Sequence, residues 1–205
     1  INRRDDIDNN IEALMEALDR TTKIEQHSEI ATYETCETAI SQLRANFDRT
    51  WGGFGKAPKF PSTMNLEVVL RQLLAGEDSE LENIVTTSLD AMASGGMYDH
   101  IGGGFSRYSV DEQWLVPHFE KMLYDQALLA RVYLHAGILF GNQTWLHVAR
   151  EIIDYVLRDL THHDGGFFSA EDADSLDADG HSHEGHFYVW SREEFSAVLP
   201  AHLRD

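Results

Sequence analysis

Residues 98–122 read YDHIGGGFSRYSVDEQWLVPHFEKM and carry more ionisable and aromatic side chains than a connection between two helices requires. Histidine and carboxylate groups can act as general acids and bases, and aromatic rings can pack on the apolar faces of sugar rings. The segment is therefore a candidate binding site for a small polar ligand. An equally good interpretation is a self-contained loop, in which Arg107 pairs with Asp99 or Asp111. The side chains that we expect to bind substrate are Asp99, His100, Arg107, Tyr108, Asp111, Trp114 and Lys121.

A long helix is predicted over residues 118–140, with Pro117 at its first turn. On such a helix His118, Lys121 and Asp125 share one stripe. The other faces are apolar, so the helix should be buried, and its polar groups need partners or a wet cavity. We therefore predict His118 and Asp125 as catalytic groups at the mouth of a cavity, with Lys121 orienting its neighbours. The alternative is a Lys121–Asp125 ion pair, with His118 capping its own helix.

An acidic segment interrupts the helical pattern at residues 166–190, where two aromatic-rich flanks predict a β-hairpin with a long tip. Glu171 and Asp172 lie near the start of this hairpin and are further catalytic candidates, because two carboxylates with one kept protonated can perform glycosidase or epimerase chemistry. The tip fits a calcium loop poorly. Its histidines are able to bind a transition metal, but a hydrated tip is the favoured interpretation. We therefore expect no metal and no cofactor. The histidines are His181, His183 and His186.

The composition limits the kind of partner. The net charge is −19, and such a field repels phosphate backbones, so no nucleic-acid partner is expected. No apolar run approaches the roughly 18 residues of a membrane span, so no membrane partner is expected. Lys56 and Lys59 could bind an anionic group or simply be solvated. Cys36, the single cysteine, is predicted to be a buried core thiol because apolar residues recur around it at helical spacing.

The elements that position these groups are helices, which the periodic spacing of apolar residues predicts. The predicted helices cover residues 5–20, 29–49, 64–75, 80–94, 118–140 and 145–160. Ser62 or Thr63 offers an N-cap, and SREE at 191–194 predicts a capping box for a last helix.

Long and short connections alternate between these helices. Three loops contain a double glycine followed by an apolar residue, in TWGGFG, ASGGMY and HDGGFF, whereas AGEDS and FGNQT are short. Helical hairpins stacked with their long loops on one rim predict an all-α fold, part of an α/α toroid of the six-hairpin glycosidase type, with one β-hairpin at the rim. An irregular helical bundle is the alternative. The chain begins at Ile1 and ends just after a helix is predicted to start, so we expect a piece of a longer protein.

Three segments carry a resemblance to a known family: GGFGKAPKFP, GGMYDHIGGGFSRYSVDEQWLVPHFEKMLYDQALL, and GGFFSAEDADS followed by EGHFYVW. Over about residues 50–190 the chain resembles the thioredoxin-domain-containing proteins related to bacterial YyaL and its animal spermatogenesis-associated homologue. The resemblance implies a thioredoxin-like domain followed by a helical region similar to the (α/α)6 toroids of N-acylglucosamine 2-epimerases and six-hairpin glycosidases.

This resemblance also implies a division of the chain. Residues 1–28 would be a linker with an N-terminal helix, following a thioredoxin-like domain that this chain lacks, and residues 29–205 would be part of the toroid. No C-x-x-C occurs here, so redox chemistry would belong to the thioredoxin-like domain, which becomes an expected partner within the full-length chain. We expect the protein to be cytoplasmic.

Two functions follow as hypotheses. The first is a region that binds or processes a carbohydrate, with epimerase-like or glycosidase-like acid–base chemistry at the loop rim and a small, saccharide-like ligand. The second is a non-catalytic module that docks clients for the thioredoxin-like domain. A helical scaffold that binds nothing is a third interpretation, in which internal salt bridges occupy the rim.

Overall fold

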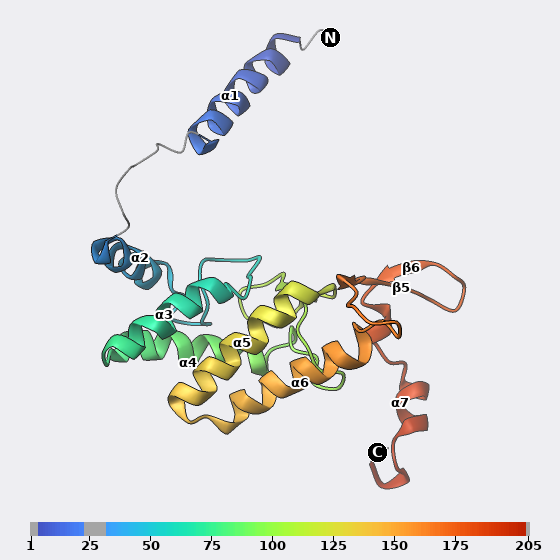
Figure 1. Ribbon diagram of the computed structural model, residues 1–205. Helices are drawn as coiled ribbons and strands as arrows, with labels where there is room; N and C mark the ends of the chain where they lie inside the picture. The colour runs from blue at the N-terminus through green and yellow to red at the C-terminus, as the bar shows by residue number, and fades with distance from the viewer. Residues whose placement is uncertain (1–3, 23–31, 204–205) are drawn as a thin grey trace. The chain divides into compact units, whose positions relative to one another are not determined.

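The computed structural model describes residues 4–22 and 32–203 and divides the chain into two units, residues 1–36 and 37–205 (Figure 1). In the first unit, helix α1 (Arg4–Thr22) confirms the helix predicted over 5–20. The apolar side chains Ile11, Leu14, Met15 and Leu18 lie on α1 and are exposed within this unit. The predicted linker extends into residues 23–31, which lie outside the described residues. The domain boundary at residue 28 therefore stays a prediction.

Helix α2 (Tyr33–Asn46) leads into the second unit and corresponds to the helix predicted over 29–49, of which residues 29–31 lie outside the described part. Only Ile40 is buried on α2, and Phe47 is buried directly after it. Cys36 lies one turn before Ile40 and is exposed. The prediction of a buried core thiol is therefore wrong, because the apolar face of α2 is covered only from Ile40 onward.

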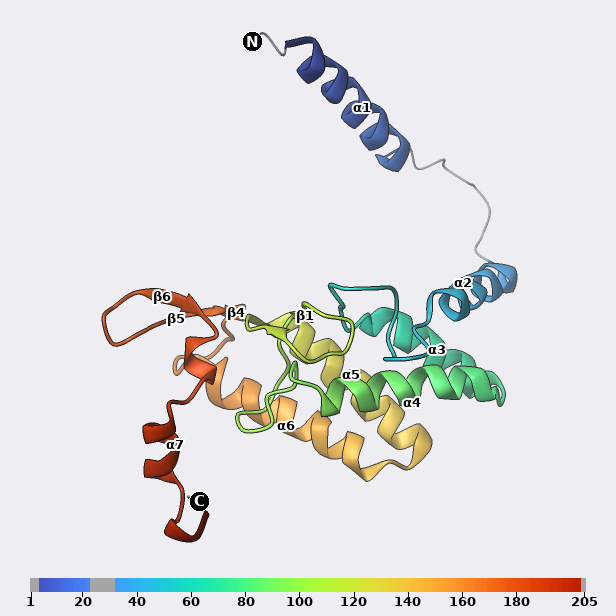
Figure 2. The same cartoon turned by 180° about the vertical axis from the view of Figure 1, so that it is seen from behind.

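Two helical hairpins form the body of the second unit. Helices α3 (Thr63–Ala75) and α4 (Ser79–Ser94) make the first hairpin, and α5 (Leu123–Phe140) and α6 (Gln143–Asp159) make the second. Each short connection ends in a side-chain cap, since the Asp78 carboxylate accepts the first amides of α4 and the Asn142 side chain does the same for α6. The core between the helices includes the fully buried side chains Leu66, Ile84 and Val132. Figures 1 and 2 show the four helices packed side by side.

Three long loops gather at one end of these helices, opposite the two short connections (Figure 1). They are residues 47–62, 95–122 and 160–191, each of which contains one of the double glycines. Backbone pairing joins them to one another: Lys59 pairs with Ser109, and β3 (Lys121–Met122) pairs with β4 (Ala170–Glu171). The rim predicted from the loop pattern is therefore present as a continuous structure.

Short strands and a final helix complete the rim. Strand β1 (Tyr108–Ser109) pairs with β2 (Pro117–His118), and β5 (Asp174–Leu176) pairs with β6 (Ser182–Glu184). The β5–β6 pair confirms the predicted hairpin, which projects beyond the helices (Figure 2). The short 3-10 helices η1 (His186–Tyr188) and η2 (Ala201–Leu203) flank α7 (Arg192–Val198). Ser191 and Glu194 form the predicted capping box at the start of α7.

Two predictions about helix starts need correction. The helix predicted from residue 118 begins at Leu123, and Pro117–His118 and Lys121–Met122 are strands instead. Pro117 is therefore not in the first turn of a helix. Ser62 does precede α3 as its N-cap, but its backbone is left-handed (φ 48°) and its hydroxyl makes no capping bond to the helix.

Candidate acid–base site at the loop rim

The backbone conformation of residues 117–122 divides the predicted site into two parts. On a helix His118 and Lys121 would share a face, but these residues lie in strands β2 and β3, and successive side chains of extended backbone point to opposite sides. His118 and Glu120 lie on one side, where their Nε2 and Oε2 atoms are 3.7 Å apart. Phe119 and Lys121 lie on the other side and both contact Tyr188.

We call the first group the His118 face, defined by Arg107, Tyr108, His118, Glu120, Asp125 and Glu184. The imidazole of His118 is held by the Glu184 carboxylate and the Tyr108 ring. Its Nδ1 donates to Glu184 Oε1 at 2.8 Å, and the imidazole stacks on the Tyr108 ring at a centroid distance of 4.7 Å. A donor at Nδ1 leaves the Nε2 lone pair available as a base. The His118 side chain is 25% exposed, so this nitrogen is within reach of a ligand.

A charged pair adjoins His118 on the same face. Arg107 Nη1 donates to Glu120 Oε2 at 2.9 Å, and the guanidinium has its pKa raised first of all by this bond. Arg107 thus pairs with Glu120, and neither the Asp99 nor the Asp111 pairing of the self-contained-loop interpretation forms. Because Glu120 contacts both Arg107 and His118, it couples the cation to the imidazole.

Asp125 is the least satisfied group of this face. Its Oδ2 is buried and has no hydrogen-bond partner among the described residues. Burial raises the pKa of Asp125 to about 6, Arg107 opposes the rise and Glu120 adds to it. A carboxyl group with such a pKa exchanges protons near neutral pH, which is what a general acid or base needs. The structure therefore brings His118, Arg107 and Asp125 together on the His118 face, as charged and proton-exchanging groups around Glu120.

The second group, the Lys121 face, consists of Asp99, Lys121, Tyr155, Glu171 and Tyr188. The Lys121 side chain is only 2% exposed, and its Nζ donates to Asp99 Oδ2 at 2.8 Å and to the Gly103 carbonyl at 3.0 Å. The ammonium also lies 4.3 Å from the centre of the Tyr155 ring, a cation–π contact. Lys121 therefore does not pair with Asp125, contrary to the alternative helical interpretation.

Carboxylates complete this face. Burial opposes ionisation of Asp99, but the Lys121 ammonium and the amides of Gly102 and Ile101 outweigh it and lower the pKa of that carboxyl. Glu171 Oε2 accepts the Tyr155 hydroxyl at 2.6 Å, and burial together with this carboxylate raises the tyrosine pKa well above its usual value. An open pocket of about 480 Å³ lies over these groups. The ionisable side chains of the Lys121 face thus satisfy one another.

The glycine triplet is explained by this packing. Gly103 and Gly104 have φ of +78° and +77°, which side chains other than glycine rarely adopt. A Cβ on Gly104 would lie 2.6 Å from the Tyr155 ring, and one on Gly103 would lie 2.9 Å from the Glu151 carbonyl oxygen. The glycines therefore allow the loop to approach α6.

The other predicted residues form their hydrogen bonds outside both faces. His100 bonds the Gly95 carbonyl through Nε2 and is exposed. Asp111 accepts three amides of its own loop, from Gln113, Leu115 and Val116. Trp114 is fully buried and donates its indole N–H to the Trp51 carbonyl.

Two further candidates also act locally. Asp172 is exposed and accepts the Asp174 amide in a turn. Lys59 is fully buried against Asp48 and the Glu112 carbonyl, so the suggestion that it binds an external anion is wrong. Lys56 is exposed.

Four contact residues escaped the sequence analysis: Glu120, Glu184, Tyr155 and Tyr188. For Glu120 a signal existed, because it is two residues beyond His118, the spacing of side chains on one side of a strand. The other three reach His118 or Lys121 only through non-local contacts: Tyr155 is 34 residues beyond Lys121, Glu184 is 66 beyond His118 and Tyr188 is 67 beyond Lys121.

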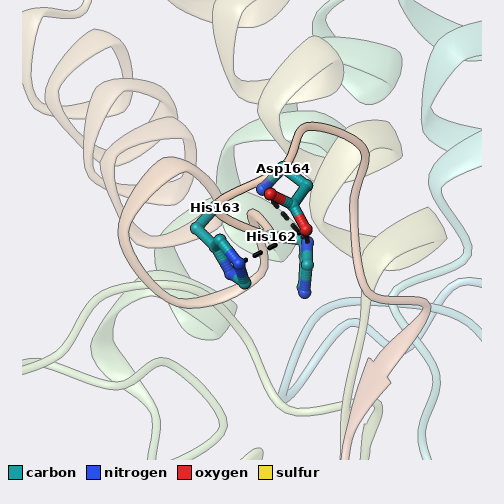
Figure 3. A group of neighbouring side chains, drawn as sticks. All are labelled: His162, His163 and Asp164. Carbon is teal, nitrogen blue, oxygen red and sulfur yellow. Dashed lines mark hydrogen bonds and ion pairs between the residues drawn. The ribbon is translucent and has the colours of Figure 1, made fainter.

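Two histidine clusters on the rim have donor atoms close enough to hold a metal ion. They are His162–His163–Asp164, on the turn that follows α6 (Figure 3), and Asp177–His181–His183, at the tip of the β5–β6 hairpin. The residues of both clusters form their contacts with residues outside the His118 and Lys121 faces. Neither cluster therefore belongs to the acid–base groups described above.

Comparison with known proteins finds relatives by sequence and, separately, solved structures with a similar fold. Human spermatogenesis-associated protein 20 is 46% identical over 166 residues, which is 78% of this chain and 21% of that protein. An uncharacterized protein of Caenorhabditis elegans is 40% identical over 174 residues, 81% of this chain and 24% of the relative. The chain thus spans about a fifth of the length of the curated relatives that it matches. No family model matches it.

Solved structures share the fold at low identity. A sugar epimerase from a ruminal bacterium aligns with a TM-score of 0.57 at 16% identity, covering 65% of this chain and 37% of the epimerase. Cellobiose 2-epimerase from Spirochaeta thermophila aligns with a TM-score of 0.59 at 18% identity, covering 68% and 40%. Among the described residues, no helix combines the length and apolarity that crossing a membrane demands. The body of the chain is therefore part of an α/α toroid, and over the region that they share the chain is similar to spermatogenesis-associated protein 20.

Proposed function

We propose that the His118 face is the acid–base centre of a carbohydrate-processing toroid and that the reaction is proton transfer at a carbon next to a sugar carbonyl. One observation carries this proposal: a buried carboxyl oxygen of Asp125 has no partner among the described residues, in a group where Arg107 and Glu120 act on its pKa and Glu184 fixes the orientation of His118. A sugar hydroxyl is a suitable partner for that oxygen, since it both donates and accepts hydrogen bonds. The fold shared with sugar epimerases supports the substrate class.

Each group has a role in this proposal. His118 Nε2 takes the proton from carbon, because Glu184 holds Nδ1 as the donor. Asp125, with its pKa of about 6, supplies or receives the second proton at oxygen. Arg107 stabilises the negative charge that develops on that oxygen. The ring of Tyr108 lines the site beside His118.

Epimerase-like chemistry is favoured over glycosidase-like chemistry by where the carboxylates lie. The pair predicted to flank a glycosidic bond, Glu171 and Asp172, consists of successive residues at the end of β4. Glu171 is bound to Tyr155 on the Lys121 face, whereas Asp172 is exposed and engaged in a turn. On the His118 face, Glu120 is bonded to Arg107 and Glu184 to His118, which leaves the histidine and the Asp125 carboxyl as the acid–base candidates.

The cavity itself requires more helices than this chain supplies. The chain covers 37% and 40% of the two epimerases and about a fifth of its curated relatives. In this proposal the remaining hairpins of a longer protein close the toroid over the His118 face, and the thioredoxin-like domain implied by the family resemblance lies in the same chain. The cytoplasm is the proposed location.

The test measures proton exchange directly. The longer protein that carries this sequence is incubated in D₂O with reducing mono- and disaccharides, and NMR follows deuterium incorporation next to the carbonyl and the appearance of the epimer. His118→Ala should reduce the rate by about 10² or more, since a general base contributes about that factor. Asp125→Asn should reduce it as well. His100→Ala is the matched control, because His100 is an exposed histidine of the same loop whose partners, the Gly95 carbonyl and the Tyr98 ring, do not belong to the His118 face.

The outcomes separate the hypotheses. Unchanged exchange in a folded His118→Ala variant would show that the assignment is wrong. If no saccharide exchanges or raises the melting temperature, but thiol-containing peptides do raise it, the docking module is the better description.

A further inference from the structure

The tip of the β5–β6 hairpin places two imidazoles and one carboxylate around a common point. The ladder of this hairpin pairs Ser175 with His183 and Leu176 with Ser182, and the turn is closed by a bond from the Asp177 amide to the His181 carbonyl. His181 and His183 are two residues apart at and beside β6, so their side chains lie on the same side of the strand. The distance between their ring centroids is 6.4 Å.

The carboxylate of Asp177 is fixed by the turn before any ligand binds. Its Oδ1 accepts the amides of Asp179 at 2.9 Å and of His181 at 2.8 Å. This leaves Oδ2 toward the imidazoles, 3.1 Å from His183 Nε2 and 3.5 Å from His181 Nδ1. These backbone bonds also lower the pKa of Asp177 and keep it ionised. The side chain of Asp177 is only 22% exposed although it lies at a hairpin tip.

The separations match those of ligands around one metal ion. Zinc binds imidazole nitrogen and carboxylate oxygen at about 2.0–2.1 Å, so two ligands at a right angle lie roughly 2.9 Å apart and two at a tetrahedral angle roughly 3.4 Å apart. The observed 3.1 and 3.5 Å fall close to these values. We propose that Asp177, His181 and His183 bind one divalent transition-metal ion of the zinc class, with water in the remaining positions.

The donor set selects the kind of ion. Two imidazoles favour zinc and its neighbours in the transition series over Ca²⁺ and Mg²⁺, which prefer oxygen ligands. The sequence pattern favoured a hydrated tip. It does not reveal that two backbone amides hold the Asp177 carboxylate in place.

The other histidine cluster provides a contrast. In His162–His163–Asp164 the Nδ1 of His162 already accepts the Asp164 amide at 3.1 Å, and the side chains of His163 and Asp164 are 81% and 77% exposed. Figure 3 shows these three consecutive residues on one turn. Binding a metal there through Nδ1 would break that backbone bond, and no backbone amide of the described residues holds the Asp164 carboxylate. At the hairpin tip an ion replaces only the His183–Asp177 hydrogen bond and leaves both backbone bonds of Asp177 in place, so the His162 cluster should bind more weakly.

Metal binding would also act on the His118 face. Glu184 directly follows His183 on β6 and accepts the Nδ1–H of His118. An ion that ties the strand to the turn would hold Glu184 in place. This consequence rests on the proposed function, whereas the binding itself does not.

The experiment titrates Zn²⁺ into the tag-free, metal-stripped protein by calorimetry and repeats the titration with Co²⁺, whose absorption reports the ligand set. One strongly bound ion per chain is expected. His181→Ala and His183→Ala should each weaken it about tenfold or more, Asp177→Asn should weaken it too, and His163→Ala should not. Ca²⁺ should not compete. Circular dichroism checks that each variant is folded.

Two results would overturn the site: unchanged affinity in both hairpin histidine variants, or equal losses in these variants and in His163→Ala. Failure of this test leaves the proton-exchange assay unaffected, because that assay reads His118 and not the hairpin tip.

Discussion

His118 and Lys121 are three residues apart, yet one lies on a face with an unsatisfied carboxyl and the other in a network of groups bonded to one another. Lys121 is 2% exposed and has an anionic partner, a carbonyl and an aromatic ring. His118 is 25% exposed, and its face includes Asp125, whose Oδ2 has no partner among the described residues. The difference teaches that burial of ionisable groups at this rim serves two purposes. Saturated groups join the loops to the helices, and the unsaturated group marks where a ligand can add a bond.

Removing the Lys121 ammonium should have the largest effect. In Lys121→Met the Asp99 carboxylate would remain buried without its cation, and breaking one side of such a pair costs about 3–5 kcal/mol. The free energy of unfolding, measured in urea, should fall by at least about 3 kcal/mol.

The double variant Lys121→Met with Asp99→Asn sharpens this result. It leaves no unpaired charge, so it should recover part of the loss. If Lys121→Met alone is as stable as the wild type, the Lys121 face does not anchor the rim and the contrast between the faces fails.

The sequence predicted the scaffold better than the division of the site. Double glycines and short capped connections are local signals, and from them the rim and the helical hairpins could be predicted. The helical period that holds from Leu123 onward was extended back over His118 and Lys121, where the backbone is extended. The partners Asp99, Glu171 and Glu184 reach these residues only through loop pairing, with separations of 22, 50 and 66 residues, which no local pattern encodes.

Asp125→Asn should have an intermediate effect that depends on pH. The pKa of Asp125 is about 6 in the folded chain and about 4 when unfolded, so the folded state binds more protons between these values. The stability that this group confers is therefore present below pH 4 and is lost as the pH rises through 6. Replacing it should stabilise the chain at pH 7 by about 1–2 kcal/mol, after allowance for its partial exposure, and should change little at pH 4.

For Asp99 the stability should change with pH in the opposite direction to that expected for Asp125. Its pKa is lowered, so its contribution is present above its unfolded pKa and is lost as the pH falls through its folded value. Unfolding of the wild type and of both asparagine variants, measured in urea between pH 3 and 8, separates the two groups. A gain from Asp125→Asn that is equal at pH 4 and pH 7 would contradict the raised pKa.

The smallest effect is expected from Tyr155→Phe, which removes only the hydroxyl bonded to Glu171 on the Lys121 face. Its ring contact with Lys121 remains, and water in the open pocket that Tyr155 and Glu171 line can bond the carboxylate instead. The loss should therefore be the net value of one hydrogen bond, about 1 kcal/mol or less in urea. Tyr108→Phe on the His118 face is the matched control, because that tyrosine packs through its ring against His118 and Phe60, and a change within about 0.5 kcal/mol is expected. Equal losses in the two variants would mean that the His118 face is as saturated as the Lys121 face. A loss of stability confined to Tyr155→Phe would separate the anchoring face from the reactive one.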